Sequence, residues 1–257
     1  MKRDSPMEPL PVGATEPIQP KRNKSKMRLT LTGLALLVVL AICWYIGVFG
    51  GNVHVVARGR VYRSAQLTGN AIGPLTACWT GHSLAQVIQA NGIKTVLNLR
   101  GGSEKNDWYR EERDICARLG VKHVDIFMSA IHAPHPVQLR RVLATFDHAP
   151  YPILYHCQGG SDRSGMVGTL YLHLYQGVPL DEAEQQQLTL RYGHIKYTRT
   201  GIIDRFFDMY RETSNGMGMR EWIDKVYPKL YAELPANQQS SPPTAEELKT
   251  DVQANIQ

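Results

Sequence analysis

Residues 152–165 read Pro152-Ile153-Leu154-Tyr155-His156-Cys157-Gln158-Gly159-Gly160-Ser161-Asp162-Arg163-Ser164-Gly165. Residues 152–155 are apolar or aromatic, and together with His156 they predict a short buried strand. Residues 163–175 predict a helix, and Gly177 is a typical residue for ending it. The glycine-rich segment between them is therefore predicted to turn tightly from strand into helix. Such a turn presents the N–H groups of a helix N-terminus to an anion.

The residues of this turn suit the chemistry of a phosphate monoester. Gly159, Gly160 and Gly165 let the backbone curl closely around an oxyanion. Arg163 can reach back as a planar, two-pronged donor to phosphoryl oxygens. The same positive field lowers the pKa of the Cys157 thiol and so supplies a thiolate. We predict that this thiolate attacks phosphorus and that water then hydrolyses the phosphocysteine.

The remaining residues of the turn have supporting roles in this prediction. Ser164 can donate a hydrogen bond to the sulfur and help it leave in the second step. His156 is expected to orient the loop through hydrogen bonds. Thiolate chemistry needs neither a metal ion nor an organic cofactor, and the sequence implies none. The predicted phosphate-binding residues are Gln158, Gly159, Gly160, Ser161, Asp162 and Arg163.

Residues 156–165 resemble the signature of the cysteine-dependent protein tyrosine and dual-specificity phosphatases, His-Cys-x5-Arg-Ser/Thr-Gly. Two upstream stretches, residues 61–66 (VYRSAQ) and 95–100 (TVLNLR), are similar to those of compact bacterial members. The resemblance covers roughly residues 59–177. A rhodanese-like domain also places a cysteine in an anion-binding loop, but the Arg-Ser-Gly ending favours the phosphatase.

Strands and helices alternate along the rest of the chain, which predicts an α/β fold with a central, mostly parallel sheet flanked by helices. In such sheets the ligand lies beyond the C-terminal ends of the strands, where the loop after residue 156 is expected. Residues 53–234 are predicted to form the domain. The expected strands are residues 60–64 (at an edge), 93–99, 121–127 and 152–156, and the expected helices are residues 83–90, 107–119, 136–146, 163–175, 180–192, 201–212 and 220–231.

The general acid for the leaving group has several candidates. The resemblance implies an Asp about 30 residues before the cysteine, and Asp125 fits by count. However, the helix predicted from Pro136 places the acid loop at residues 128–133, which hold no Asp, and Asp125 then lies inside a strand.

Asp162 is the favoured acid, because a bound dianion favours the protonated form of a nearby carboxyl group. Its alternative role is to pair with a neighbouring basic group and shape the loop. His132 and His135 are the remaining candidates for the acid.

The N-terminal part of the chain predicts a membrane anchor. Residues 29–49 carry no charge over 21 positions, enough to cross a bilayer core of about 30 Å as a helix. Residues 1–28 hold seven Lys and Arg residues and are predicted to be a disordered tail in the cytoplasm. The phosphatase domain is then expected on the opposite side of the membrane. A cleaved signal peptide is the alternative, although the apolar stretch exceeds the usual length of about 7–15 residues.

The formal net charge of +6 comes mostly from this tail and does not indicate nucleic-acid binding. Residues 235–257 are polar and are predicted to be a flexible C-terminal tail. Cys78 and Cys116 could form a disulfide in an oxidising compartment, but two buried thiols are the simpler interpretation.

The loop also bears on the substrate. It has no lysine, and the charge of Asp162 would repel a polyphosphorylated headgroup. This favours a singly phosphorylated group such as phosphotyrosine in a protein. A lipid phosphate monoester is the alternative, because the anchor would confine the site near a bilayer. A catalytically weak phosphate-binding module is a third hypothesis. Trp79, Trp108 and Tyr109 could line the substrate site, although such residues more often lie in the core.

Overall fold

The computed structural model describes residues 32–42, 51–67, 83–196, 198–244 and 248. The chain divides into two compact units, Met1–Ala41 and Ile42–Gln257. In the first unit, the described residues 32–41 are helical and exposed. Among the described residues, no helix is both long enough and apolar enough to cross a membrane. The predicted anchor, residues 29–49, extends beyond the described residues at both ends.

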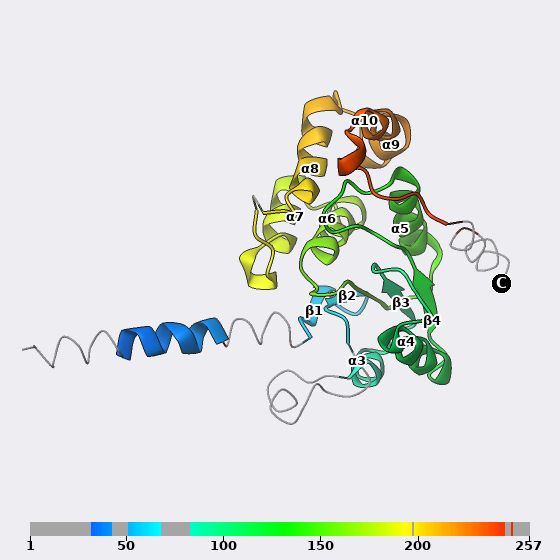
Figure 1. The fold of residues 1–257 in the computed structure, drawn as a ribbon. Helices are drawn as coiled ribbons and strands as arrows, with labels where there is room; N and C mark the ends of the chain where they lie inside the picture. The colour runs from blue at the N-terminus through cyan, green and yellow to red at the C-terminus, as the bar shows by residue number, and fades with distance from the viewer. Residues whose placement is uncertain (1–31, 43–50, 68–82, 197, 245–247, 249–257) are drawn as a thin grey trace, which may run out of the picture. The chain divides into compact units, whose positions relative to one another are not determined.

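The second unit is built on a five-stranded sheet with the order β1-β2-β5-β3-β4 (Figure 1). β2 pairs with β5, β5 with β3 and β3 with β4 in parallel, whereas β1 pairs antiparallel with β2. The predicted α/β fold with a mostly parallel sheet is therefore confirmed. The strands are β1 His54–Ala57, β2 Val61–Ser64, β3 Thr95–Asn98, β4 Lys122–Asp125 and β5 Ile153–His156.

The prediction that residues 60–64 form an edge strand is wrong. β2 is buried along its whole length and lies between β1 and β5. β1 occupies the edge instead. Its four residues have a mixed burial pattern and give too short a signal to predict a strand from sequence.

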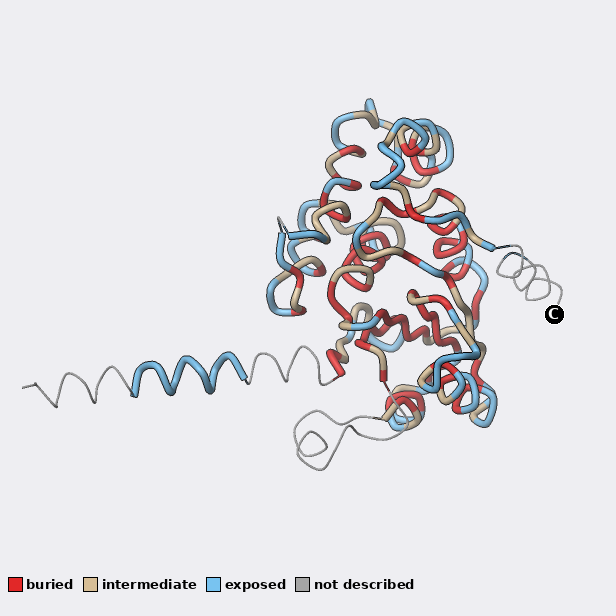
Figure 2. The backbone as a smooth tube through the Cα atoms, viewed as in Figure 1, coloured by how far each residue is buried: buried red, intermediate tan, exposed pale blue. Residues whose placement is uncertain are grey.

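Helices cover both faces of the sheet (Figure 1). Alternate residues of β5 point to opposite faces, so Leu154 packs in a small core beneath α3 and α4, whereas Ile153 and Tyr155 belong to the larger core beneath the remaining helices. The buried residues concentrate in the sheet between these layers (Figure 2). The helices are α3 Leu84–Asn91, α4 Asp107–Arg118, α5 Pro136–His148, α6 Asp162–Gln176, α7 Leu180–Gln187, α8 Ile202–Thr213, α9 Met219–Lys225 and α10 Tyr227–Glu233.

Two predicted helices are each interrupted. Residues 180–192 form α7 and a separate 3-10 turn, Leu190–Tyr192. Residues 220–231 form α9 and α10, and Pro228 lies in the first turn of α10. Proline lacks an N–H group, so it is tolerated at a helix start but not in a helix interior.

The packed chain continues beyond residue 234, where sequence analysis places the end of the domain. A 3-10 turn, Ala236–Gln238, follows α10. The Ala133 N–H donates to the Gln238 carbonyl at 2.7 Å, and the Tyr231 hydroxyl donates to the Ser240 carbonyl at 2.6 Å. These contacts attach the chain up to Ser240 to the loop that precedes α5 and to α10.

Candidate active site

The predicted phosphate loop, residues 156–165, runs from the end of β5 through residues 157–161 into the first turn of α6, at the C-terminal ends of the parallel strands. Cys157 follows β5 directly and is only 3% exposed. Gly160 has a φ of +67°, and a Cβ atom there would lie 2.5 Å from the Ala65 nitrogen. Only glycine can therefore occupy this position without moving the end of β2.

The surroundings of Cys157 favour its thiolate. Burial raises the pKa of the thiol, but the positive charge of Arg163 opposes this effect. The hydroxyl and N–H of Ser164 and the N–H of Gly160 oppose it further, and the net pKa is lowered. The Ser164 hydroxyl also lies 3.5 Å from the Ser64 carbonyl, to which it donates in the structure. These donors stabilise a negative sulfur at the base of the loop.

Arg163 lies in the first turn of α6, and one nitrogen of its guanidinium group, Nη1, is held by hydrogen bonds to the backbone. Its Nη1 donates to the carbonyl oxygens of Met128 at 3.2 Å and Leu99 at 3.4 Å. Its Nε is buried and has no hydrogen-bond partner among the described residues. A buried donor beside a thiolate and a helix N-terminus is suited to bind an oxyanion.

The carbonyl groups of the loop are held from outside. The Gln158 carbonyl accepts a hydrogen bond from the Gln66 N–H at 3.2 Å, and the carbonyls of Gly159, Gly160 and Ser161 also accept bonds from residues outside the loop. These bonds fix the backbone of the loop from outside.

Arg63 on β2 is the main support of the loop, and sequence analysis did not assign it a role. It is fully buried, and its Nη2 donates to the carbonyls of Gly160 at 2.6 Å and Ser161 at 3.1 Å. Its Nη1 donates to the carbonyl and side-chain oxygens of Gln187 on α7, and its guanidinium group stacks 4.2 Å from the Tyr192 ring centre. The sequence signals are an arginine within a predicted strand and its place in residues 61–66 (VYRSAQ), which are similar to those of compact bacterial phosphatases.

Asn52 is a second support that sequence analysis missed. Its Nδ2 donates to the carbonyls of Gly159 at 2.9 Å and Tyr192 at 3.0 Å, and its φ is +43°. Its Oδ1 lies 2.8 Å from Nε2 of His54. Burial and the charges of Arg63 and Arg191 lower the pKa of His54 to about 4, so a neutral imidazole donates this hydrogen bond.

His156 lies directly behind the cysteine, where it can orient the loop as predicted. Its Nδ1 is 3.3 Å from the Cys157 carbonyl, and its Nε2 is 3.0 Å from Oε2 of Glu112 on α4. Oε1 of Glu112 lies 2.8 Å from Nε2 of His123. All three groups are buried or nearly so.

Glu112 and His156 each stabilise the charged form of the other. Burial raises the pKa of Glu112, but the charge of His156 and the hydrogen bonds from His123 and His156 outweigh burial and lower the pKa to about 2. Burial lowers the pKa of His156, but Glu112 outweighs it, and the net pKa is raised. An imidazolium ion therefore lies next to the backbone of Cys157.

Asp125, one candidate for the acid, is the last residue of β4. Its Oδ1 accepts a hydrogen bond from Asn98 at 2.8 Å, and its Oδ2 accepts one from the Tyr109 hydroxyl at 2.6 Å. Both carboxylate oxygens are thus already engaged by groups on β3 and α4.

The two histidine candidates lie in the loop after β4, which holds no Asp, as expected from the sequence. Nδ1 of His132 is 2.8 Å from the Ser129 hydroxyl. Nδ1 of His135 accepts a hydrogen bond from the Val137 N–H at 3.2 Å and caps α5. Among the described residues, neither histidine makes a hydrogen bond or ion pair with the phosphate loop.

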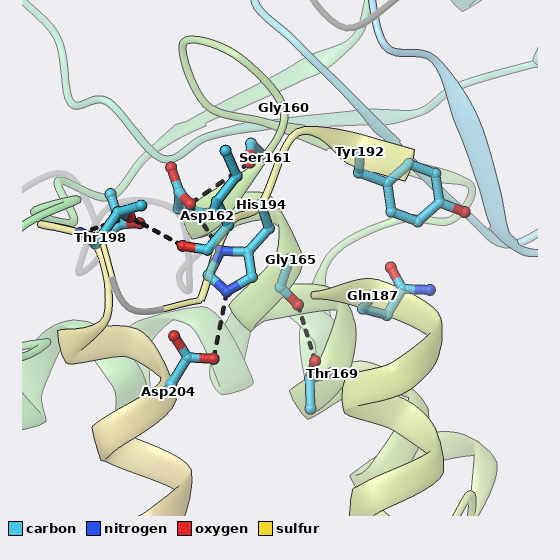
Figure 3. Close-up of polar contacts among 12 residues, drawn as sticks. Gly160, Ser161, Asp162, Gly165, Thr169, Gln187, Tyr192, His194, Thr198 and Asp204 are labelled. Carbon is cyan, nitrogen blue, oxygen red and sulfur yellow. Dashed lines mark hydrogen bonds and ion pairs between the residues drawn. The ribbon is translucent and has the colours of Figure 1, made fainter. Parts of the chain in front are cut away.

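Asp162 is the first residue of α6, and Figure 3 shows its side chain turned towards His194. Nδ1 of His194 is 2.8 Å from Oδ1 of Asp162, and its Nε2 is 3.3 Å from Oδ1 of Asp204 on α8. Burial lowers the pKa of His194, but its two carboxylate partners outweigh burial and raise the pKa to about 9. His194 and Asp204 were not predicted from sequence, because both are distant from the loop in the chain.

Of the three aromatic residues considered for the substrate site, two lie in the described part of the chain, and they differ in burial. Trp108 is half-buried, and the guanidinium group of Arg100 lies 4.1 Å from its ring centre. Tyr109 is buried and binds Asp125, so it belongs to the core. Trp79 lies outside the described residues.

Of the two cysteines considered for a disulfide, Cys116 is a free, buried thiol whose pKa is raised to about 12 by burial and by the charges of Glu112 and Asp125. Cys78 lies outside the described residues.

Comparisons with known proteins found similar solved structures and a matching family. TpbA from P. aeruginosa is 17% identical, with 64% of this chain and 92% of TpbA covered and a TM-score of 0.46. The catalytic domain of the PP-IP phosphatase SIW14 from S. cerevisiae is also 17% identical, with 63% of this chain and 93% of that domain covered and a TM-score of 0.45. No curated protein matches the chain.

The sequence model of the tyrosine phosphatase family matches residues 47–192. The matched region contains the phosphate loop and its supports Asn52 and Arg63. Because the match spans more than half of the sequence, this chain belongs to the tyrosine phosphatase family, whose hydrolytic chemistry depends on a cysteine.

Proposed function

We propose that this protein is a membrane-anchored phosphatase that hydrolyses phosphate monoesters with Cys157, and that its substrate is phosphotyrosine in a protein. One observation carries the proposal. A buried cysteine with a lowered pKa lies in a strand-to-helix loop next to Arg163, whose buried Nε has no partner among the described residues. A phosphoryl group is the ligand that such a pair of thiolate and guanidinium group fits best.

The reaction takes place in two steps. The N–H groups of the loop and the Arg163 guanidinium group bind the non-bridging oxygens of the phosphate. The Cys157 thiolate attacks phosphorus in line, the bond to the ester oxygen breaks, and a phosphocysteine forms. Water then attacks this intermediate and releases phosphate. The hydrogen bond from Ser164 stabilises the departing thiolate.

We assign the proton for the leaving oxygen to Asp162. It lies in the loop itself, whereas both oxygens of Asp125 are already engaged. Nδ1 of the protonated His194 lies 2.8 Å from Oδ1 of Asp162 and can pass a proton to this carboxyl group as the ester bond breaks. Asp162→Asn should slow hydrolysis of phenyl phosphate more than that of para-nitrophenyl phosphate, because only the poorer leaving group depends strongly on protonation. An equal effect on both would remove Asp162 from this role.

The nucleophile has a matched control in the same chain. Cys116 and Cys157 are both buried, free thiols, but Cys116 lies in the small core under α4. In the full chain, Cys157→Ser should abolish hydrolysis of para-nitrophenyl phosphate in the presence of EDTA, and Cys116→Ser should retain it. Turnover that survives Cys157→Ser would refute the proposal. Phosphate binding without any wild-type turnover would instead support a phosphate-binding module.

A lipid phosphate monoester is the second candidate substrate, because the charge-free segment of residues 29–49 would hold the site near a bilayer. The two substrates are distinguished by comparing kcat/KM on phosphotyrosine peptides with kcat/KM on vesicles that contain a lipid phosphate monoester. A strong preference for the vesicles would overturn the assignment to phosphotyrosine.

The membrane anchor and its orientation also belong to the proposal. The absence of charge over residues 29–49 and the seven basic residues before them support a cytoplasmic N-terminus with the phosphatase domain on the opposite side. Extraction of membranes at alkaline pH should leave the full chain in the membrane fraction, and a protease added from the cytoplasmic side should remove only the tail. Release of the whole chain by the alkaline wash would contradict the anchor.

A further inference from the structure

An acidic residue in a phosphate loop raises an electrostatic problem. Asp162 opens α6, where the N–H groups and Arg163 bind the phosphate in the proposed function. A carboxylate at this place repels a phosphate dianion, because like charges at such separations cost free energy in a partly buried site. The loop needs a cation at Asp162 if it is to bind the dianion.

His194 is placed to supply that charge. Its side chain is almost fully buried and lies between two carboxylates, Oδ1 of Asp162 at 2.8 Å and Oδ1 of Asp204 at 3.3 Å (Figure 3). The second oxygen of Asp204 is buried and has no hydrogen-bond partner among the described residues. A buried carboxylate in this state is stable only beside a cation, so Asp204 keeps His194 protonated.

The other charges near this pair do not replace His194. Arg63 lies close enough to Asp162 to feel its charge, but its Nη atoms donate to carbonyl and amide oxygens. Lys196 and Arg199, on the same segment as His194, are exposed. The charged groups in contact with His194 are Asp162 from α6 and Asp204 from α8.

We propose that His194, held by Asp204, is a positioning residue that neutralises Asp162 and so allows the loop to bind a phosphate dianion. This inference rests on the proposed function, since it assigns a role in the same site. The match to the tyrosine phosphatase family ends at Tyr192, so His194 and Asp204 lie outside the residues that define it. In this proposal, a residue of the segment before α8, His194, neutralises the negative charge of Asp162 in the phosphate loop.

The test is a double-mutant cycle read by the binding of inorganic phosphate to the full chain. His194→Gln keeps a side chain that can donate a hydrogen bond but removes the positive charge. It should weaken phosphate binding about tenfold, the effect of one uncompensated charge worth about 1.4 kcal/mol. The double variant Asp162→Asn/His194→Gln has no uncompensated carboxylate in the loop and should recover most of this loss. His148→Gln, an exposed histidine at the end of α5, is the control and should bind as the wild type does.

A purely structural role for His194 predicts no recovery in the double variant, and that result would overturn the inference. If His194→Gln fails to fold, Asp204→Asn provides a second measurement. Without Asp204, His194 loses its proton at lower pH, so phosphate binding should weaken at a lower pH than in the wild type. An unchanged pH dependence would also overturn the inference.

The role of His194 and the proposed function can be refuted separately. Turnover by the wild type that depends on Cys157, together with unaltered phosphate binding in His194→Gln, would sink only the role of His194. Absence of wild-type turnover would sink the proposed function, while the phosphate-binding cycle could still be read.

Discussion

Two buried histidines hold the two ends of the phosphate loop, and they do so in different ways. His156 precedes Cys157 and is paired with Glu112, whose side chain is 1% exposed. His194 reaches the other end of the loop and is paired with Asp162, whose side chain is 24% exposed. Both histidines have a raised pKa because of their carboxylate partners, which outweigh the effect of burial.

The difference in burial separates two functions of an ion pair. The carboxylate of Glu112 is out of reach of the substrate, so the His156 pair can only hold the loop and act on the Cys157 thiolate from behind. The carboxylate of Asp162 belongs to the loop and is partly open to solvent, so the His194 pair acts on the charge that a substrate meets. Loss of the first pair should affect mainly stability, and loss of the second mainly binding.

The largest effect is expected for Glu112→Gln. Removing one partner of a buried pair leaves the other charge without compensation and costs about 3 kcal/mol. The free energy of unfolding, measured by urea denaturation near neutral pH, should fall by about this amount. Glu111→Gln, at the neighbouring and less buried position of α4, is the matched control and should change it little. An equal effect of the two variants would contradict the comparison.

The pH dependence of this effect follows from both partners. Glu112 has its pKa lowered from 4.5 to about 2, so its contribution is present above pH 4.5 and is lost as the pH falls through 2. His156 has its pKa raised from 6.5, so its contribution is present below pH 6.5 and is lost as the pH rises through the raised value. The difference between wild type and Glu112→Gln should therefore be greatest between these limits.

The next largest effect is expected for Arg63→Lys, which tests whether the loop needs a support besides the two histidines. A lysine keeps the positive charge but cannot bind the loop carbonyls and Gln187 at once. The resulting displacement of the loop should lower kcat/KM for para-nitrophenyl phosphate about 100-fold. Arg60→Lys, an exposed arginine just before β2, should have no such effect. Nearly full activity of Arg63→Lys would show that charge alone is sufficient.

The sequence predicts one of these supports and not the others, for a physical reason. The strand, the loop and α6 are contiguous, so their periodicity and their glycines predict the turn and place His156 beside the cysteine. Glu112, Arg63 and His194 reach the loop from α4, β2 and the segment before α8, and nothing in their local sequence indicates the contact. Their roles depend on the packing of distant elements, which a local pattern does not encode.

The fold shows the same limit. β3 and β5 were predicted because they lie in buried apolar runs. β4 was also predicted, although it is only half-buried, and β2 was predicted but wrongly placed at the edge. β1 was missed because its four residues, three half-buried and one exposed, carry no clear alternation. Both helices that were predicted as continuous are divided, one at Leu188, where the backbone leaves helical geometry, and the other just before Pro228, which lacks an N–H group.

A smaller effect is expected from His194, whose contribution to stability depends on pH. The pKa of His194 is raised from 6.5 to about 9, so its stabilising contribution is present below pH 6.5 and is lost as the pH rises through 9. The thermal midpoint of the wild type should therefore fall between pH 7 and pH 10 by more than that of His194→Gln. Scanning calorimetry of both proteins at the two pH values provides the measurement, and equal falls would show that the His194 pair does not contribute.

The smallest effect is expected for Arg100→Gln, which asks whether an exposed cation near the loop matters as much as the buried ones. Arg100 follows β3, stacks on Trp108, and neighbours Leu99, whose carbonyl accepts a hydrogen bond from Arg163. Its partial burial and the charge of Arg163 lower its pKa, which places the two guanidinium groups within each other's field.

Because Arg100 is half-exposed, solvent and salt screen its attraction for a dianion, and its removal should lower kcat/KM by no more than about fivefold. The loss should be greater at low salt than at high salt, whereas the effect of His194→Gln should depend less on salt because that pair is buried. Arg58→Gln, in the turn before β2 at the opposite end of the sheet, is the control for a change in net charge alone. If Arg100→Gln and Arg58→Gln have the same effect at each salt concentration, Arg100 acts only through net charge, and compensation of charge in this site depends on the buried histidines.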